Sequence, residues 1–257
     1  MNNYGRVIDL SYANGDVNFE IIKNAKNTPI SAAIIRLGFG GDYINQDDEK
    51  FYDNVKKCKK YNIPYGVYLY SYADSEKKAK SEAMHALRVL GNLNPVLPVF
   101  YDIEEKRTIR KSNDKILSIC RTFAYEIEKA GFEYGTYASL SVWNDKLRDK
   151  WFQNKKVWVA QWSGSGCSYK KRYDLWQYTS SGKIYGGSFQ SGYGPFDLNY
   201  IYYDFKKADA ENKKREAEKV LKISAKLEKI SPEEMKKLDR DGDGKITAKD
   251  ARKILTE

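Results

Sequence analysis

The chain has 257 residues and the composition of a folded protein, with 41% hydrophobic and 14% aromatic residues. Its formal net charge of +10 favours contact with polyanions, whether nucleic acid, anionic membrane or cell-wall polymer. The sequence contains no apolar run of about 18 residues and no basic segment interleaved with aromatic residues, which argues against a membrane span and against nucleic-acid binding. The cysteines Cys58, Cys120 and Cys167 form no CxxC metal pattern, and we expect free buried thiols at Cys58 and Cys120, which fall on predicted helices. The single histidine, His85, has no neighbours that would support a Ser-His-Asp or Cys-His mechanism.

Apolar β-type runs alternate with helical patterns through the first two-thirds of the chain. The predicted strands cover residues 6–12, 32–38, 64–73, 95–105, 134–139, 157–163 and 174–180. The predicted helices cover about residues 19–25, 47–61, 75–90, 113–130 and 141–150. This alternation predicts an α/β fold, an irregular (β/α) barrel of the TIM type. Because the linkers 163–174 and 180–197 lack helical periodicity, we expect reduced helices there and hairpins between the last strands.

The fourth predicted strand, PVLPVFYDIEE, ends in three carboxylates. Side chains on a strand alternate between faces, so Asp102 and Glu104 point the same way, with Cα atoms about 6.6 Å apart. Crowding and partial burial would separate their pKa values, leaving one as a protonated general acid and the other ionised. In the simpler interpretation, these carboxylates cap the next helix or pair with Lys106 and Arg107.

Other polar and aromatic residues fall near the ends of predicted strands. In a parallel barrel these ends meet on one face, where catalytic groups lie, so Asp9 and Asp197 would join Asp102 and Glu104 there. The candidate substrate-binding residues on this face are Tyr68, Tyr70, Tyr137, Gln161, Trp162 and Asn199. Taken singly, the two aspartates could be turn residues and each aromatic residue could belong to the core.

Seven segments follow one another in the order VIDLSYANGDVNF, GVYLYSYA, PVFYDIE, YGTYAS, VWVAQWS, DLWQYTSSG and FDLN. Over about residues 4–205 they resemble the glycoside hydrolase family 25 lysozymes. The resemblance implies cleavage of the β-1,4 bond between N-acetylmuramic acid and N-acetylglucosamine in peptidoglycan, with retention and without a catalytic cofactor. It also implies that Glu104 is the general acid, Asp102 its companion, and Asp9 and Asp197 flanking acids. One difference is Leu69, which stands where the family often has histidine.

The role of Asp102 has two alternatives, nucleophile or orienter of the substrate's acetamido group. A direct nucleophile calls for carboxyl groups about 5 to 5.5 Å apart. Residues two apart on a strand begin at about 6.6 Å, so we favour the substrate-assisted route, in which the acetamide attacks its own anomeric carbon.

After Tyr203 the composition becomes charged and helical, and we place the boundary between a catalytic domain, residues 1–205, and a small all-α module, residues 206–257. Residues 239–250 have the spacing of a calcium loop, with Gly244 at the turn. The expected ligands are Asp239, Asp241, Asp243, the backbone of Lys245, Thr247 and Asp250. The simpler interpretation is a solvated acidic loop.

An aspartate at the last loop position, Asp250, resembles the dockerin modules of cellulosomal and gut bacterial proteins. Dockerins are duplicated, and the segment from Glu216 aligns with the segment from Asp250. The same offset places Phe205 and Lys207 where Asp239 and Asp241 stand, so we expect one structural calcium site and a degenerate first repeat. The module would either bind a cohesin-like scaffold protein or pack on the barrel and stabilise it.

The resulting expectation is a monomeric bacterial muramidase that acts on cell-wall peptidoglycan. MNNYGRVIDL lacks the pattern of a signal peptide, so the protein is either cytoplasmic or a mature form. Given the expected substrate, we favour a secreted or cell-surface protein whose signal has been removed. Two alternatives remain open: an inactive glycan-binding barrel attached to a cohesin-type scaffold, and a phage-type endolysin.

Overall fold

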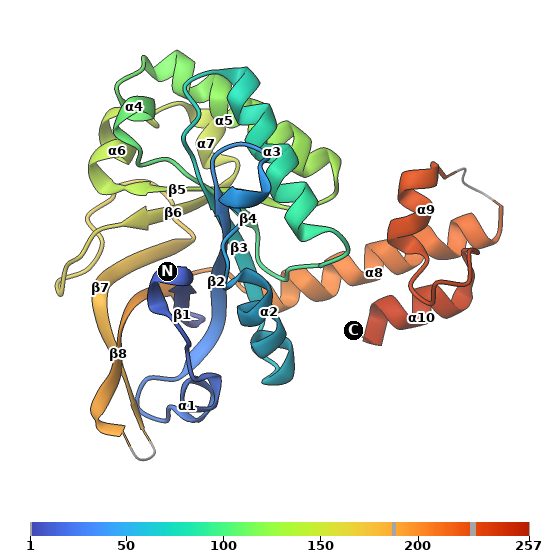
Figure 1. The fold of residues 1–257 in the computed structure, drawn as a ribbon, viewed down its shortest axis with the longest axis horizontal. Coiled ribbons are helices and arrows are strands. Elements are labelled where there is room, and N and C mark those ends of the chain that lie inside the picture. The colour runs from blue at the N-terminus through green and yellow to red at the C-terminus, as the bar shows by residue number, and fades with distance from the viewer. Residues whose placement is uncertain (1, 187–188, 227–229, 257) are drawn as a thin grey trace. The chain divides into compact units, whose positions relative to one another are not determined.

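The computed structural model describes residues 2–186, 189–226 and 230–256, which form two compact units, residues 1–203 and 204–257. The first unit is a barrel surrounded by helices, and the second is helical (Figure 1). In the described part of the chain, no helix is long and apolar enough to cross a membrane.

Eight strands close the barrel in sequence order. They are β1 (Gly5–Leu10), β2 (Ile30–Phe39), β3 (Tyr65–Tyr70), β4 (Val99–Asp102), β5 (Tyr134–Ser139), β6 (Lys156–Ala160), β7 (Leu175–Gly186) and β8 (Phe189–Ile201). Neighbours from β1 to β7 are parallel, whereas β8 is antiparallel to both β7 and β1. The prediction of a closed barrel is therefore confirmed, with one reversed strand.

Helices follow each of the strands β1 to β5 and lie on the outer side of that part of the barrel (Figure 1). The α-helices are α1 (Phe19–Asn24), α2 (Phe51–Lys60), α3 (Glu76–Leu90), α4 (Lys106–Ile109), α5 (Asn113–Lys129), α6 (Leu140–Asp145) and α7 (Lys150–Gln153), and the 3-10 helices are η1 (Tyr12–Asn14) and η2 (Ile44–Gln46). Serines at the N-caps begin the two longest of these: Ser75 accepts from Lys78 N, and Ser112 accepts from Lys115 N.

Alternation along the strands divides the barrel into two apolar layers. Outward side chains such as Ile35, Val67 and Tyr101 join the helices in one buried core. Inward side chains meet at Trp158, whose ring lies 5.1 Å from that of Phe100. The polar residues that continue these inward rows toward the carboxyl ends of the strands form the candidate site.

The prediction of a hairpin between the sixth and seventh strands is wrong, because β6 and β7 are parallel. The connection crosses from one end of the barrel to the other without a helix, and its buried Tyr169 packs on Trp143 of α6 at 5.7 Å. The contact between Tyr169 and Trp143 thus holds the connection to the barrel where a parallel strand pair usually has a connecting helix. The hairpin between β7 and β8 is confirmed, and β7 extends to 12 residues through part of the predicted linker.

The second unit contains α8 (Phe205–Ser224), α9 (Pro232–Leu238) and α10 (Ala248–Thr256). A capping box begins α9, since Ser231 accepts from Glu234 N and the Glu234 side chain accepts from Ser231 N. The unit has its own small core, which comprises Ala217, Val220, Ile223, Leu238, Ala251 and Ile254.

Candidate active site

Aromatic rings form the floor of the site inside the barrel. The centroid of the Trp158 ring lies 4.6 Å from that of Tyr137 of β5 and 6.2 Å from that of Tyr68 of β3, and both ring pairs meet edge-on. Its indole Nε1 donates to Asn199 Oδ1 at 2.7 Å. Because a buried indole N–H needs an acceptor, this bond fixes both the ring and the amide of Asn199.

Asp9 and Asp197 face each other across the antiparallel pair of β1 and β8. Gln177 Nε2 lies within 3.4 Å of both carboxyl groups, so the two are close enough for the titration of one to depend on that of the other. Burial raises the pKa of Asp9 well above its usual range, and the charge of Asp197 raises it further. Burial also raises the pKa of Asp197. The pair therefore holds a proton more firmly than isolated aspartates do.

Two amides hold this carboxyl pair in place. Asn199 Nδ2 donates to Asp9 Oδ2 at 2.7 Å and to Val7 O at 3.2 Å. Gln177 Nε2 lies 3.3 Å from Asp9 Oδ2 and 3.4 Å from Asp197 Oδ2. Both amides therefore donate to Asp9 Oδ2, and Gln177 bridges the two aspartates.

Asp102 ends β4, aligned with Tyr70 of β3 on one side and Tyr137 of β5 on the other. It is 3% exposed. Burial raises the pKa of Asp102 well above its usual range, the charges of Glu104 and Asp9 add to the rise, and Arg36 opposes it. Among the described residues, no donor reaches Asp102 Oδ1, a buried acceptor.

Glu104 lies two residues beyond Asp102, and the strand-like alternation continues to it. Ile103 N still donates to Tyr137 O at 2.9 Å, and the Ile103 side chain is buried in the outer core. Glu104 is exposed to solvent, yet the protein atoms around its carboxyl group partly desolvate it and raise its pKa, and Asp197 and Glu105 add to the rise. Glu104 is thus a reachable carboxyl group that binds a proton more tightly than usual.

The simpler interpretation of the acidic strand end holds for Glu105. Its side chain caps α4 by accepting from Arg107 N at 3.3 Å, and Tyr70 OH lies 3.4 Å from Glu105 Oε2. Glu104 has no such capping role among the described contacts.

The predicted substrate-binding residues separate into three groups. Tyr68 and Tyr70 are half-buried beside the acids, and Tyr137 is buried and donates to Gln177 Oε1 at 3.1 Å. Trp162 is 66% exposed, and its Nε1 also donates to Gln177 Oε1. The other two, Gln161 and Asn199, have internal roles.

Gln161 Oε1 accepts from the backbone and hydroxyl of Ser168, so it folds its own loop. Asn199 is fully buried and supports Asp9 from below. Direct substrate contact by Asn199 does not agree with this burial.

Sequence reasoning missed Gln177 and Arg36. Gln177 joins Asp9, Asp197, Tyr137 and Trp162, but in DLWQYTS it reads as an ordinary polar strand residue. Arg36 could have been noticed, because a single charge interrupts the apolar run AAIIRLG.

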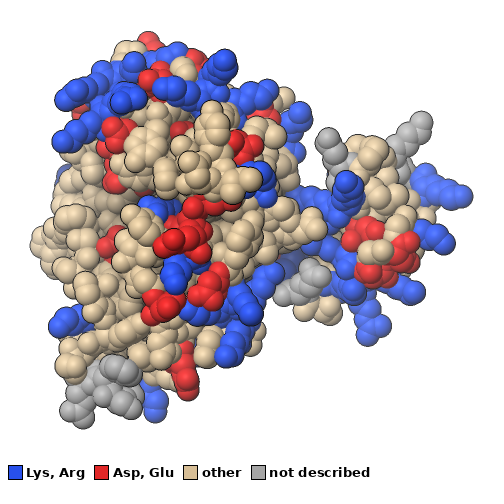
Figure 2. Space-filling view, viewed as in Figure 1, with Lys and Arg blue, Asp and Glu red and all other residues tan. Residues whose placement is uncertain are grey.

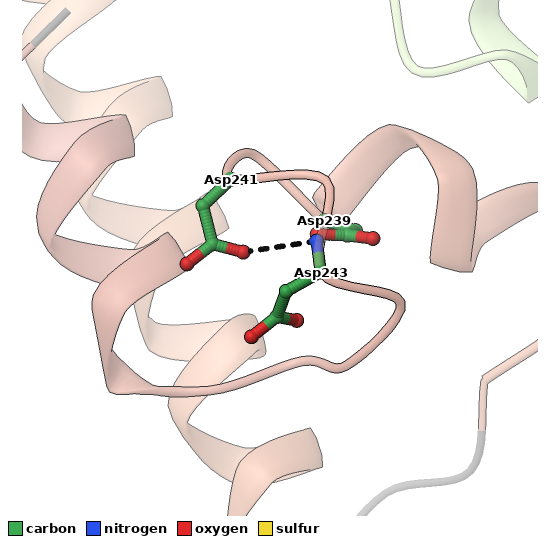
Figure 3. A group of neighbouring side chains, drawn as sticks. All are labelled: Asp239, Asp241 and Asp243. Carbon is green, nitrogen blue, oxygen red and sulfur yellow. Dashed lines mark hydrogen bonds between the residues drawn. The ribbon is translucent and has the colours of Figure 1, made fainter.

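A second acidic group lies in the loop between α9 and α10 (Figure 3). Carboxylate oxygens of Asp239, Asp241 and Asp243 lie within 4.8 Å of one another, the one group of potential metal ligands among the described residues. Asp239 accepts from the backbone of Gly242 and Gly244, both at 2.8 Å. Figure 2 shows acidic side chains gathered on one part of this unit, among lysine and arginine.

The three other predicted calcium ligands lie outside this group of three. Asp250 is buried, and its carboxylate accepts from the backbone N–H groups of Arg240 and Thr247, both at 2.8 Å. Burial would raise the pKa of Asp250, but these backbone bonds outweigh it and lower the pKa. Thr247 Oγ1 also donates to Asp250 Oδ2, and Lys245 N donates to Asp243 Oδ1 at 2.8 Å. In this structure Asp250 therefore stabilises the loop through hydrogen bonds with its backbone.

The chain matches the model of the glycosyl hydrolases family 25 over residues 8–187, more than half its length. A similar solved structure is that of the modular autolysin LytC from Streptococcus pneumoniae with a synthetic peptidoglycan ligand. It is 25% identical with a TM-score of 0.65, and the match covers 77% of this chain and 46% of that one. This chain thus spans less than half of the autolysin.

Two further structures share the fold. A family 25 glycosyl hydrolase from Bacillus anthracis is 20% identical with a TM-score of 0.67, covering 80% of this chain and 92% of that one. A family 25 lysozyme from Aspergillus fumigatus is 21% identical with a TM-score of 0.63, covering 79% and 96%. Among curated proteins, no sequence match was found.

Proposed function

Because the chain belongs to the glycosyl hydrolases family 25 and is a glycoside hydrolase, we propose that it cleaves the β-1,4 bond between N-acetylmuramic acid and N-acetylglucosamine in peptidoglycan. The likeness to an autolysin solved with a synthetic peptidoglycan ligand supports this substrate. An enzyme with this substrate acts outside the cytoplasmic membrane, as a secreted or cell-surface protein.

The observation that carries the proposal is the contrast between Glu104 and Asp102. Both have raised pKa values, but Glu104 is open to solvent while Asp102 is covered. A general acid must bind its proton more tightly than an ordinary carboxyl group does and must reach the leaving oxygen, and the raised pKa and the exposure of Glu104 support both points. Asp197 assists, since its negative charge favours the protonated form of Glu104.

We assign Asp102 to the substrate-assisted route of retention. Its Oδ1 is a buried acceptor without a donor among the described residues, and leaving such an atom unpaired costs about 1 to 3 kcal/mol. The N–H of the substrate's 2-acetamido group is a donor of the right kind. By accepting it, Asp102 would direct the acetamido carbonyl oxygen toward the anomeric carbon.

In the first step Glu104 gives its proton to the glycosidic oxygen, the bond from the anomeric carbon to that oxygen breaks, and the acetamido oxygen bonds to the anomeric carbon. In the second step water attacks the same carbon, the bond to the acetamido oxygen breaks, and Glu104 accepts a proton from the water. Two inversions give net retention. A covalent glycosyl adduct trapped on Asp102 with a fluorinated substrate would overturn this assignment in favour of a direct nucleophile.

Digestion of purified peptidoglycan tests the activity. We expect the native chain to release fragments that end in reducing N-acetylmuramic acid, identified by mass spectrometry. Glu104→Gln should lower the rate by about 10²- to 10⁴-fold, the usual contribution of a general acid. Glu105→Gln is the matched control: glutamine can still cap α4, and removing a charge that only adds to the rise in the Glu104 pKa should lower the rate far less. If the native chain binds the wall without cleaving it, the barrel is a glycan-binding module and the proposal is wrong.

For the C-terminal unit we propose one structural calcium site in the loop of Asp239, Asp241 and Asp243. Hard carboxylate oxygens suit calcium, and Gly244, at a φ of 78°, adopts the left-handed turn that the loop needs. Thr247, Asp250 and the Lys245 carbonyl would complete the ligand set, which requires Asp250 to release its backbone bonds. Titration calorimetry with calcium, and with magnesium as control, measures this binding directly.

We further propose a dockerin-like role for this unit, which a pull-down with cohesin domains tests. Capture in calcium but not in EDTA supports docking. An empty pull-down in calcium contradicts docking and leaves the unit a stabilising role.

A further inference from the structure

Exposed aromatic rings gather at the carboxyl ends of the first three strands. Tyr12 follows β1 and is 50% exposed, and Tyr72 follows β3 and is 45% exposed. Phe39 ends β2, the strand between them, and is half-buried. Single exposed rings are common on protein surfaces, whereas a group of them marks a surface that binds a ligand.

Measured contacts join these rings into one row. The guanidinium carbon of Arg36 lies 4.6 Å from the centroid of the Tyr12 ring and 5.8 Å from that of Phe39. The Phe39 and Tyr72 rings meet edge-on with their centroids 6.1 Å apart. The Tyr72 centroid lies 5.2 Å from that of Tyr70. The row therefore runs without a break from the end of β1 to the end of β3.

The strand register brings this row to the acids. Phe39 pairs with Tyr70, and Tyr70 pairs with Asp102, so these three side chains lie side by side on the inner side of the barrel. The residue after Tyr70 donates its backbone N–H to Asp102 O at 3.1 Å, which continues the ladder past the strand ends. Tyr72 lies two residues beyond Tyr70, as Glu104 lies two beyond Asp102. Tyr72 therefore occupies the level of Glu104, one strand away.

A buried carboxylate holds Tyr72 in this place. Glu82 of α3 is 1% exposed, and its Oε1 accepts from Tyr72 N at 2.8 Å. Its Oε2 accepts from Ser71 Oγ at 2.8 Å and from the hydroxyl group of Tyr101. The segment that carries the Tyr72 ring is thus fixed to α3 and β4 before any ligand binds, which lowers the entropic cost of binding.

The far end of the row is fixed by a second carboxylate. Arg36 Nε donates to Asp48 Oδ2 at 2.8 Å, and the Asp48 side chain is fully covered. The same oxygen accepts from Tyr12 N at 3.0 Å. Asp48 thus holds the guanidinium and the backbone of Tyr12 together, and the guanidinium over the ring strengthens the contact.

We propose that Tyr12, Phe39 and Tyr72 extend the substrate site and bind at least one sugar unit of the glycan strand beyond the two that the cleaved bond joins. The proposal rests on the proposed function and names the side of Glu104 on which the strand continues, over the ends of β3, β2 and β1. Pyranose rings present C–H groups that pack on aromatic faces. Because the row begins beside the acids, at Tyr70, its occupant is the strand that the acids cleave.

NMR of the tyrosine rings tests this placement directly. We would label the ring carbons with ¹³C in Glu104→Gln, which is expected to bind without cleaving, and assign the signals with Tyr12→Phe and Tyr72→Phe. Titration with an octasaccharide prepared from peptidoglycan should shift the signals of Tyr12 and Tyr72 together with that of Tyr70. A shift of Tyr70 alone would overturn the inference and leave the proposed function standing.

The same titration separates the inference from the proposed hydrolysis in the other direction. Shifts of all three rings, in a protein whose native form does not cleave peptidoglycan, would support glycan binding by the row and overturn the hydrolysis alone. The absence of any shift would contradict both.

Kinetics on long glycan strands give a second measurement. Tyr72→Ala should raise KM by about 2- to 10-fold, far more than it lowers kcat, because a ring contact of this kind binds substrate and transition state alike. Tyr72→Phe should recover most of the loss, since it keeps the ring. Tyr125→Ala is the matched control, because Tyr125 is 63% exposed on α5, outside the row.

Two kinetic outcomes would overturn the role of Tyr72. One is a native KM in Tyr72→Ala, and the other is an equal loss in Tyr72→Phe and Tyr72→Ala. Melting temperatures of all variants show whether each one folds.

Discussion

The molecule carries two groups of carboxylates in opposite surroundings. In the barrel, Asp9 and Asp102 are buried, and their pKa values are raised because burial disfavours the charged form. In the C-terminal unit, Asp239 and Asp241 are half-buried and Asp243 is exposed, in a loop whose backbone N–H groups already orient them. The first arrangement suits proton transfer and the second suits a cation. The same side chain thus acquires its chemistry from its degree of burial and from its hydrogen-bond donors.

The amide donors differ as well. Neutral side-chain amides, those of Asn199 and Gln177, orient Asp9 without removing its need for a proton. Backbone amides in the loop donate to both oxygens of Asp239 but to Oδ1 alone of Asp241 and of Asp243. Three experiments, two with variants and one with calcium, test this difference between the two acidic groups.

The largest effect is expected from Asn199→Leu. Leucine would leave the Trp158 indole N–H without its acceptor, would remove a donor from the Val7 carbonyl, and would leave Asp9 Oδ2 only the longer bond from Gln177. These losses should lower the free energy of unfolding by about 3 kcal/mol. Urea denaturation followed by tryptophan fluorescence measures the loss. The exposed Asn92→Leu should change stability by less than about 0.5 kcal/mol. Equal stability of the two variants would mean that the amide does not hold the acid pair.

The second-largest effect on stability is expected from the addition of calcium. At about 100 times its dissociation constant, calcium should stabilise the C-terminal unit by about 2.7 kcal/mol and leave the barrel unchanged. Differential scanning calorimetry with and without EDTA can follow the two units. Asp241→Asn should lose the response, while Asp209→Asn, which alters an ion pair on α8, should keep it. A calcium response of the barrel would contradict the division of roles between the two acidic groups.

The smallest effect concerns Asp9→Asn. The folded-state pKa of Asp9 is raised, so the folded protein binds this proton more tightly than the unfolded chain does. The contribution of Asp9 to the free energy of unfolding is therefore fully present below the unfolded-state pKa of about 3.9 and is lost as pH rises through the folded-state pKa. Asparagine mimics the protonated form, since it still accepts from Asn199 and can donate to Asp197. It should therefore raise the free energy of unfolding at pH 7 by about 1 to 2 kcal/mol, and the gain should vanish in acid.

Denaturant titrations from acid to neutral pH check this pH dependence. Asp16→Asn provides a control of opposite sign, because the hydrogen bond with Lys50 lowers the pKa of the exposed Asp16. A gain of stability at neutral pH in Asp16→Asn, or none in Asp9→Asn, would show that burial is not what separates the two cases.

Much of the barrel and its acids could be predicted from the sequence. Residues 134–139 form β5 with the predicted bounds, and Asp102 and Glu104 were identified because charges follow a buried apolar run. The parallel β6–β7 pair could not be predicted, because the connection between these strands packs through Tyr169 and has no helical period.

By itself, the sequence determined which residues are acids at strand ends and which segment has the spacing of a calcium loop, since both depend on local order along the chain. Only the tertiary structure decided which side chains meet. Gln177 and Asn199 reach Asp9 because barrel closure pairs β8 with both β7 and β1. Arg36 lies on the inner side of the barrel because of the register of β2, and register depends on contacts between strands that are distant in sequence.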